Sequence, residues 1–180
     1  MTELPFHRAR PEASVATPLA LAEIRRFDAV IDARSPSEFD DDRLPGAINA
    51  PVLDDRERAL VGTVYKERGA FEAKRIGAPL VARNIAQAIE ARFGDRPRDW
   101  RPLVYCWRGG GRSGALVHVL RQVGWHAVRL EGGYKAFRRQ VVADLDEMPT
   151  RFRFHVICGA TGSGKSRLLE ALAEAGAQVL

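Results

Sequence analysis

Residues 102–113 read PLVYCWRGGGRS, and this stretch of the chain decides the fold. Its first four residues are largely apolar, which predicts a short buried strand that ends at Cys106. Three consecutive glycines follow and predict a tight loop, and a helix is expected over residues 114–123. A buried strand, a glycine-rich loop and a helix in this order are typical of an α/β fold built on a parallel sheet.

The rest of the chain supplies further elements of the same kind, with compact apolar runs as strands and helically spaced apolar residues as helices. The expected strands are residues 29–33, a short strand to which the turn at 44–49 leads, and residues 127–130. The expected helices are residues 19–26, a helix that begins at Pro36 after the cap residue Ser35, a helical stretch at 54–93 interrupted at Gly69, Gly77 and Pro79, and residues 134–146. Strands that alternate with helices predict a parallel sheet covered on both faces.

The loop after Cys106 has the features of an anion-binding site. Glycines let several backbone N–H groups point inward, the helix that opens near Ser113 contributes partial positive charge, and Arg112 can hold an oxyanion through two parallel hydrogen bonds. A cysteine in such surroundings is favoured as its thiolate, the nucleophilic form, so Cys106 is assigned as the catalytic residue. The residues assigned to substrate or oxyanion binding are Trp107, Arg108, Gly109, Gly110, Gly111, Arg112 and Ser113.

Plainer interpretations exist for the same residues. A lone cysteine at a strand end is more often a small core residue than a nucleophile. Trp107 can simply cover the loop, and Arg108 is as compatible with a surface charge as with a substrate contact. The combination of a strand, Cys-x5-Arg-Ser and a helix favours the functional interpretation of Cys106 and leaves Trp107 and Arg108 open.

A second glycine-rich loop lies at residues 159–166 (GATGSGKS). It follows an apolar run at 152–158, expected as a strand, and precedes a helix expected to reach about residue 175, with another strand starting at 178–180. This is the context of a phosphate-binding loop (P-loop), in which Lys165 reaches the outer phosphate oxygens and Ser166 can bind Mg²⁺. No other metal ligand is assigned. The loop residues are Gly159, Ala160, Thr161, Gly162, Ser163, Gly164, Lys165 and Ser166.

The two loops fall in different domains. The expected organisation is an irregular arm at 1–18, an α/β domain at 19–146 with a helical insertion at about 54–93, a linker at 147–151, and the truncated start of a P-loop domain at 152–180. Pro149 favours the linker, because a proline disfavours helix at the residue before it.

Composition narrows the class of protein. Apolar residues make up 46% and charged residues 28% of the 180 residues, which excludes a disordered chain. Two cysteines exclude a disulfide framework, and no Cys or His spacing resembles a zinc site. The sequence has neither a signal peptide nor a run of about 20 apolar residues, so a cytoplasmic protein without a membrane segment is expected. The net charge of +5 favours anionic partners such as nucleic acid or nucleotides.

The Cys106 loop and three other segments resemble the rhodanese-like domain family. The three segments are 30–39 (VIDARSPSEF), 43–49 (RLPGAIN) and 130–137 (LEGGYKAF). The resemblance implies a rhodanese-like parallel sheet with helices on both faces, in which the loop cysteine carries sulfur as a persulfide, or selenium in the equivalent form. Asp32 and Arg34 match the family's first motif, where structural roles in holding the loop and sheet are assigned to them.

The order of the two loops and the helical insertion narrow the resemblance to the tRNA 2-selenouridine synthase family. Segments 62–66 (GTVYK), 71–77 (FEAKRIG) and 84–86 (NIA) also carry it. It implies a selenotransferase that replaces the sulfur of 2-thiouridine at the tRNA wobble position with selenium from selenophosphate, through an S-geranylated intermediate made with geranyl diphosphate. It implies no tightly bound cofactor and allows a nucleotide or Mg²⁺ at the P-loop. Members of that family are longer, so the 180 residues alone are expected to be inactive in the full reaction.

Other functions remain open at this point. A rhodanese-type sulfurtransferase or a rhodanese-fold phosphatase would use the same Cys-x5-Arg-Ser loop, although Tyr105 stands where tyrosine phosphatases usually have a histidine. A nucleotide-responsive RNA adaptor with an inert loop is a third class, against which the intact Cys106 and Arg112 argue. A basic tract is equally compatible with tRNA phosphate contacts and with a solvated face; it comprises Arg121, Arg129, Lys135, Arg138, Arg139, Arg151 and Arg153.

Overall fold

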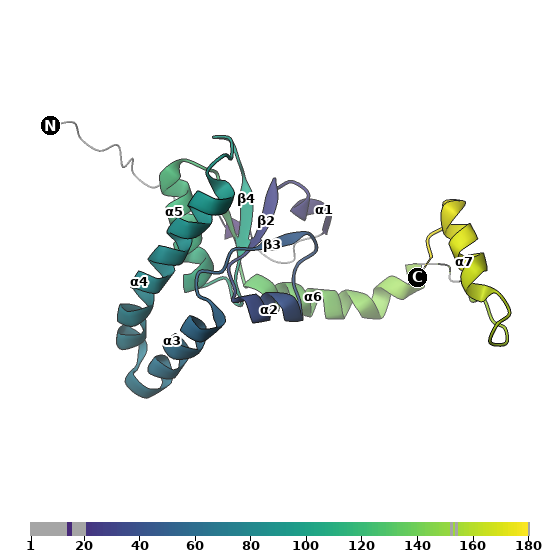
Figure 1. Ribbon diagram of the computed structural model, residues 1–180, viewed down its shortest axis with the longest axis horizontal. Helices are drawn as coiled ribbons and strands as arrows, with labels where there is room; N and C mark the ends of the chain where they lie inside the picture. The colour runs from purple at the N-terminus through teal and green to yellow at the C-terminus, as the bar shows by residue number, and fades with distance from the viewer. Residues whose placement is uncertain (1–13, 16–20, 152, 154, 180) are drawn as a thin grey trace. The chain divides into compact units, whose positions relative to one another are not determined.

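The computed structural model describes residues 14–15, 21–151, 153 and 155–179 (Figure 1). Contacts between Cα atoms group the chain into two units, Met1–Ala143 and Asp144–Leu180. The first unit holds the sheet and the Cys106 loop. The second unit holds the glycine-rich loop that precedes Lys165.

The first unit is built on a five-stranded sheet whose neighbouring strands are all parallel, in the order β1-β5-β4-β2-β3. β4 is central, with Val104 opposite Ile31 of β2 and Leu103 opposite Val128 of β5. The strands are β1 Ser14–Val15, β2 Ala29–Asp32, β3 Ala47–Asn49, β4 Pro102–Tyr105 and β5 Val128–Leu130. The predicted α/β class with a parallel sheet is confirmed.

The N-terminal part differs in detail from the expectation. Ser14–Val15, within the segment expected to be irregular, pair with β5 and so extend the sheet at one edge. The rest of residues 1–18 lies outside the described residues. The helix expected at 19–26 is the shorter α1, Leu21–Ile24.

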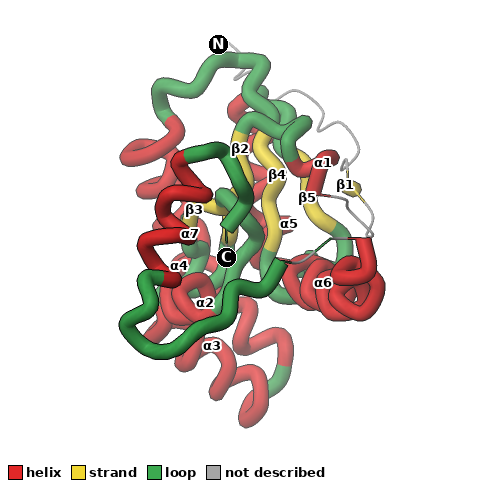
Figure 2. The backbone as a smooth tube through the Cα atoms, turned by 90° about the vertical axis from the view of Figure 1, so that its right-hand side faces the viewer, coloured by secondary structure: helices red, strands yellow, loops and turns green. Residues whose placement is uncertain are grey.

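Helices cover both faces of the sheet, because successive residues of a strand point to opposite sides. Ile31 and Val104 face α4 (Ala70–Ala88) and α5 (Gly111–Val123), and Val30 and Leu103 face α1 and α6 (Gly133–Glu147). Figure 2 shows the yellow strands between α4 and α6. Each fully buried side chain of this size stabilises the fold by about 1.5–3 kcal/mol, so the two faces together hold β4 and the loop that follows it in place.

The helical insertion expected at 54–93 consists of α3 Asp55–Arg68, α4 and the π-helical turn η1 Ile89–Phe93. The side chain of Asp54 caps α3 by accepting from the backbone N–H of Glu57 at 2.7 Å. Gly69 separates α3 from α4, but the interruption expected at Gly77 and Pro79 is wrong, because α4 runs through both. Packing explains this: Gly77 is buried, and a Cβ there would lie 3.4 Å from the Val61 side chain, so α3 and α4 support each other.

Membrane crossing can be judged for the helices in residues 21–151 and 155–179. α4 is 19 residues long, but it carries charged side chains along its length. Neither it nor any other helix in these ranges combines the length and apolarity that a bilayer span requires.

The second unit contains the end of α6, the 3₁₀ turn η2 Met148–Arg151 and α7 Lys165–Glu174. The strand expected at 152–158 is wrong for the residues that are described there, 153 and 155–158, which have no strand geometry; Phe152 and Phe154 lie outside them. Residues 178–179 are likewise not a strand, and Leu180 lies outside the described residues. A strand needs a neighbouring strand for its backbone hydrogen bonds, and the described part of this unit offers none.

Candidate functional site

Cys106 lies directly after the central strand β4 and is the first residue of the loop that leads into α5. Its side chain is buried, with 3% of the residue exposed, and its Sγ lies 3.1 Å from the Ser113 Oγ. Ser113 itself is fully buried near the start of α5. The sulfur therefore has a hydroxyl partner and lies near the N-terminal end of a 13-residue helix, whose partial charge is positive.

The loop is closed by the first turn of α6. The backbone N–H of Tyr134 donates to the Cys106 carbonyl at 2.9 Å, and that of Lys135 donates to the Trp107 carbonyl at 3.0 Å. Gly133 makes this approach possible: its φ is +57°, and a Cβ there would lie 2.1 Å from the Cys106 carbonyl oxygen. Gly133 was not assigned to the site from the sequence, although it lies within the 130–137 segment that carried the rhodanese resemblance.

The three loop glycines have three different roles. Gly109 alone has a positive φ, +65°, and a Cβ there would lie 2.5 Å from the Leu130 carbonyl oxygen. Gly110 caps α5 and Gly111 is its first residue, and neither has a positive φ. A Cβ on either Gly110 or Gly111 would meet nothing within 4 Å, so these two positions, unlike Gly109, are not closely packed.

Arg112 is held by an acidic partner. Its Nη1 donates to Glu38 Oε2 at 2.6 Å and its Nη2 donates to Glu38 Oε1 at 3.3 Å. Glu38 lies in α2, Pro36–Asp41, and also accepts from the backbone N–H of Ser35 at 3.2 Å and pairs with Arg58 of α3 at 2.9 Å. Burial would raise the pKa of the Glu38 carboxyl, but Arg112, Ser35 and Arg58 together bring that pKa below its ordinary value. Glu38 and Arg58 were missed as site residues.

Asp32 and Arg34 form a fully buried ion pair behind the loop, with Arg34 Nη2 donating to Asp32 Oδ2 at 2.7 Å. The same Nη2 donates to the Asp42 backbone carbonyl at 2.5 Å, and the guanidinium lies 4.2 Å from the ring centre of Tyr134. These contacts join β2 to the segment after α2 and to α6, which agrees with the structural roles expected for Asp32 and Arg34.

Trp107 and Arg108 extend from the loop toward solvent. The Trp107 ring is 39% exposed and packs against Tyr134, with ring centres 5.4 Å apart and planes 31° apart. Arg108 is exposed. Trp107 therefore covers one side of the loop, while Arg108 stands at its surface.

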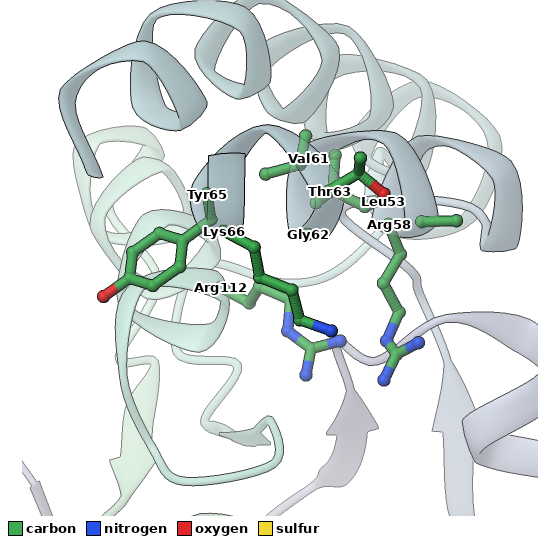
Figure 3. Close-up of a pocket in the computed structure, with 9 residues that line it drawn as sticks. Leu53, Arg58, Val61, Gly62, Thr63, Tyr65, Lys66 and Arg112 are labelled. Carbon is green, nitrogen blue, oxygen red and sulfur yellow. The ribbon is translucent and has the colours of Figure 1, made fainter. Parts of the chain in front are cut away.

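A pocket of about 610 Å³ opens beside the loop (Figure 3). Most of its wall comes from α3, and Arg112 joins that wall from the start of α5. The residues that line it are Leu53, Arg58, Ala59, Val61, Gly62, Thr63, Tyr65, Lys66 and Arg112.

In the second unit, the loop at 159–166 does precede a helix as expected. Gly164 caps α7 with a φ of +86°, and Gly162 has a φ of +82°. The Lys165 Nζ donates to the carbonyls of Gly159 at 2.8 Å and Ala160 at 2.7 Å, so the charged amine lies against the backbone of the loop. Cys158, just before the loop, is exposed.

Within the described ranges, no three His, Cys, Asp or Glu side chains gather in a way that could hold a metal ion. Ser166 is exposed near the start of α7.

The residues of the basic tract differ in exposure. Arg121 of α5 and Arg129 of β5 are half-buried, whereas Lys135, Arg138 and Arg139 are exposed on α6. Arg153 belongs to the second unit, and the Arg151 side chain lies outside the description.

The rhodanese-like domain family matches residues 17–140 of this chain. Among curated relatives, the tRNA 2-selenouridine synthase of Nitrosomonas europaea is 38% identical over 148 residues, covering 78% of this chain and 37% of that protein. The enzyme of the same name from Sulfurovum sp. is 40% identical over 147 residues, covering 81% and 40%. That from Cronobacter sakazakii is 38% identical over 161 residues, covering 85% and 41%. The chain thus spans about two fifths of the length of these relatives.

Among solved structures, the fold is similar to the N-terminal domain of a putative ATP/GTP binding protein from Clostridium difficile 630. The TM-score is 0.61 at 32% sequence identity, and the match covers 72% of this chain and 99% of that one. The similarity therefore covers nearly the whole of that domain.

Proposed function

This chain belongs to the rhodanese-like domain family, and from that premise we propose that it carries the chalcogen-transferring thiol of a tRNA 2-selenouridine synthase. The observation that carries the proposal is the Cys106 Sγ, 3.1 Å from the Ser113 Oγ at the start of α5, in a chain 38–40% identical to proteins of that name. Selenophosphate as selenium donor, geranyl diphosphate as co-substrate and tRNA bearing wobble 2-thiouridine are part of this proposal. A reducing cytoplasm would keep such a thiol free.

The chemistry proposed for Cys106 is nucleophilic. Its thiolate attacks the terminal sulfur of a donor such as thiosulfate, a new Sγ–S bond forms, the donor's S–S bond breaks, and sulfite leaves with the electron pair. The backbone N–H groups at Gly110 and Gly111 are suited to hold the anionic part of the donor or the new persulfide, because the first turn of a helix leaves its N–H groups without intrahelical partners. Arg112 adds positive charge beside the loop. Glu38 accepts two of the five N–H donors of its guanidinium, so three donors remain for an anion.

For the loop at 159–166 we propose a di- or triphosphate ligand, either a nucleotide or a prenyl diphosphate. The start of α7 supplies backbone N–H groups, and the Lys165 Nζ, now on the Gly159 and Ala160 carbonyls, can turn to phosphate oxygens. The exposed Ser166 hydroxyl could ligate Mg²⁺, which would neutralise phosphate charge when bound.

Nucleoside analysis of cellular tRNA tests the proposed function. A strain that lacks the complete gene is supplied with either the wild-type gene or its Cys106→Ser form, and 2-selenouridine is measured by mass spectrometry. The wild-type gene is expected to restore 2-selenouridine and the Cys106→Ser form is not. Equal restoration by both, or by neither, would contradict the proposal. Turnover of an aryl phosphate by the wild-type protein would instead favour the phosphatase alternative.

A further inference from the structure

The pocket beside α3 is strongly basic. Among its nine lining residues, Arg58, Lys66 and Arg112 are cations and none is acidic. Figure 3 shows the side chains of Arg58, Lys66 and Arg112 pointing in the same direction. Glu38 pairs with both arginines, but one carboxylate balances only one of the three charges. The pocket is therefore suited to an anionic ligand.

The same pocket offers an aromatic and apolar surface. Tyr65 of α3 is 60% exposed. Leu53 and Val61 add apolar wall, and Thr63 adds a hydroxyl. Cations next to an exposed aromatic ring match the chemistry of an unpaired nucleotide, whose phosphate is charged and whose base stacks on aromatic rings.

The pocket is linked to the nucleophile through α5. Arg112 lines the pocket, and the next residue, Ser113, touches the Cys106 Sγ. A ligand seated on Arg112 therefore lies next to the loop that carries the thiol.

We propose that this pocket seats one unpaired nucleotide of the RNA substrate, next to the base that receives the chalcogen. Its base stacks on Tyr65, and its phosphate lies on Lys66 with help from Arg58. This deepens the proposed function and rests on it, since an RNA substrate at Cys106 is what makes a nucleotide seat beside Arg112 useful.

The test measures RNA affinity of the 180-residue chain by fluorescence anisotropy. The probe is a labelled anticodon stem-loop RNA with wobble 2-thiouridine, and a fully paired duplex of equal length is the comparison. The variants are Tyr65→Ala and Lys66→Ala. Matched controls are Phe71→Ala, an aromatic residue that is 74% exposed on α4, and Lys74→Ala, an exposed lysine on α4; neither lines the pocket.

Tyr65→Ala is expected to weaken stem-loop binding by about tenfold, because stacking of one base on an aromatic ring is lost. Lys66→Ala is expected to reduce the slope of log affinity against log salt by about 0.7, the value for one phosphate contact with a single strand. Both controls should bind as the wild type does, and the wild type should prefer the stem-loop to the duplex.

Three outcomes overturn the nucleotide seat: no stem-loop binding by the wild type at low salt, equal losses in the pocket and control variants, or displacement of the stem-loop by inorganic pyrophosphate as efficiently as by unlabelled stem-loop. Loading of Cys106 by thiosulfate, followed separately in the wild-type chain, reports on the proposed function alone. Loading without pocket-dependent RNA binding would overturn the seat and leave the thiol chemistry standing, whereas the reverse result would overturn the thiol chemistry.

Discussion

The Arg112 guanidinium lies 2.6 Å from a Glu38 carboxylate oxygen, although 74 residues separate the two in the sequence. Glu38 also holds the Ser35 backbone N–H and the Arg58 side chain. One carboxylate thus joins α2, α3 and the start of α5. Arg112 is consequently fixed beside the Cys106 loop before any anion binds, which is the preorganisation that an anion site requires.

Loss of this carboxylate should destabilise the protein. In Glu38→Gln, Arg112 loses its negatively charged partner, and an NH2 donor replaces one of the two acceptor oxygens. Because the Glu38 side chain is only 12% exposed, the free energy of unfolding should fall by about 1–3 kcal/mol. Urea unfolding measures this. Glu72→Gln is the matched control, because Glu72 pairs with Arg75 on the exposed surface of α4 and should change stability by less than about 1 kcal/mol. Equal effects of the two substitutions would contradict the role of Glu38.

The contribution of Glu38 should also depend on pH. The pKa of the Glu38 carboxyl in the folded protein lies below the ordinary value of about 4.3, which applies to the unfolded chain. The carboxylate therefore contributes its full stabilisation at a pH above that ordinary value. The stabilisation is lost as the pH falls through the folded-state pKa. The stability difference between wild type and Glu38→Gln should therefore be constant near neutrality and shrink below about pH 4. Unfolding midpoints measured across this range provide the test. A difference that grew on acidification would have the wrong sign.

Local sequence patterns were sufficient for the strands β2, β4 and β5 and for the loop that follows Cys106, whereas the edge strand β1 was missed. The apolar run 102–105, Cys106 and Gly109 lie within eight consecutive residues. Their strand and loop could therefore be predicted from the local sequence alone. Glu38 could not be predicted as the partner of Arg112, because no periodicity relates residues in α2 and α5. The pairing arises only when β2 and β4 become neighbours in the sheet.

Gly133 should be irreplaceable in the loop. In Gly133→Ala, the new Cβ would lie 2.1 Å from the Cys106 carbonyl oxygen and 2.5 Å from the Gly109 nitrogen, in addition to the strain of a positive φ. Gly46→Ala is the control, since Gly46 has a φ of +71° but open space around it, and should cost only about 1–2 kcal/mol. Chemical unfolding of both variants compares them. A Gly133→Ala protein as stable as Gly46→Ala would show that the loop does not need this close approach.

Ser113 should support the reactive form of Cys106. Ser113→Ala removes the hydroxyl 3.1 Å from the Sγ, and one such hydrogen bond corresponds to a decrease of about two- to tenfold in the rate of Cys106 alkylation at neutral pH. The rate is measured with iodoacetamide in a Cys158→Ser background, so that only one thiol reacts. Ser113→Thr, which keeps the hydroxyl, should recover part of the rate. Unchanged alkylation in Ser113→Ala would exclude the contact as a source of reactivity.

Sequence patterns failed where an element depends on partners elsewhere in the chain. The apolar run at 152–158 is not a strand in the described residues, because the described part of its unit offers no strand beside it. Pro79 was expected to interrupt a helix, yet α4 continues, because its contact with α3 at Gly77 and its buried Ile85 stabilise it. In both cases tertiary packing outweighed local propensity.

The central claim is that Cys106 accepts a chalcogen atom, and intact-mass spectrometry tests it most directly. The protein is incubated with thiosulfate, and the mass of the wild type is compared with those of Cys106→Ser and Cys158→Ser, since these are the two cysteines of the chain. The wild type and Cys158→Ser are predicted to gain one sulfur atom, which a thiol reductant removes, while Cys106→Ser gains none. A sulfur atom added to Cys106→Ser but not to Cys158→Ser, or added to none of the three proteins, would contradict the account.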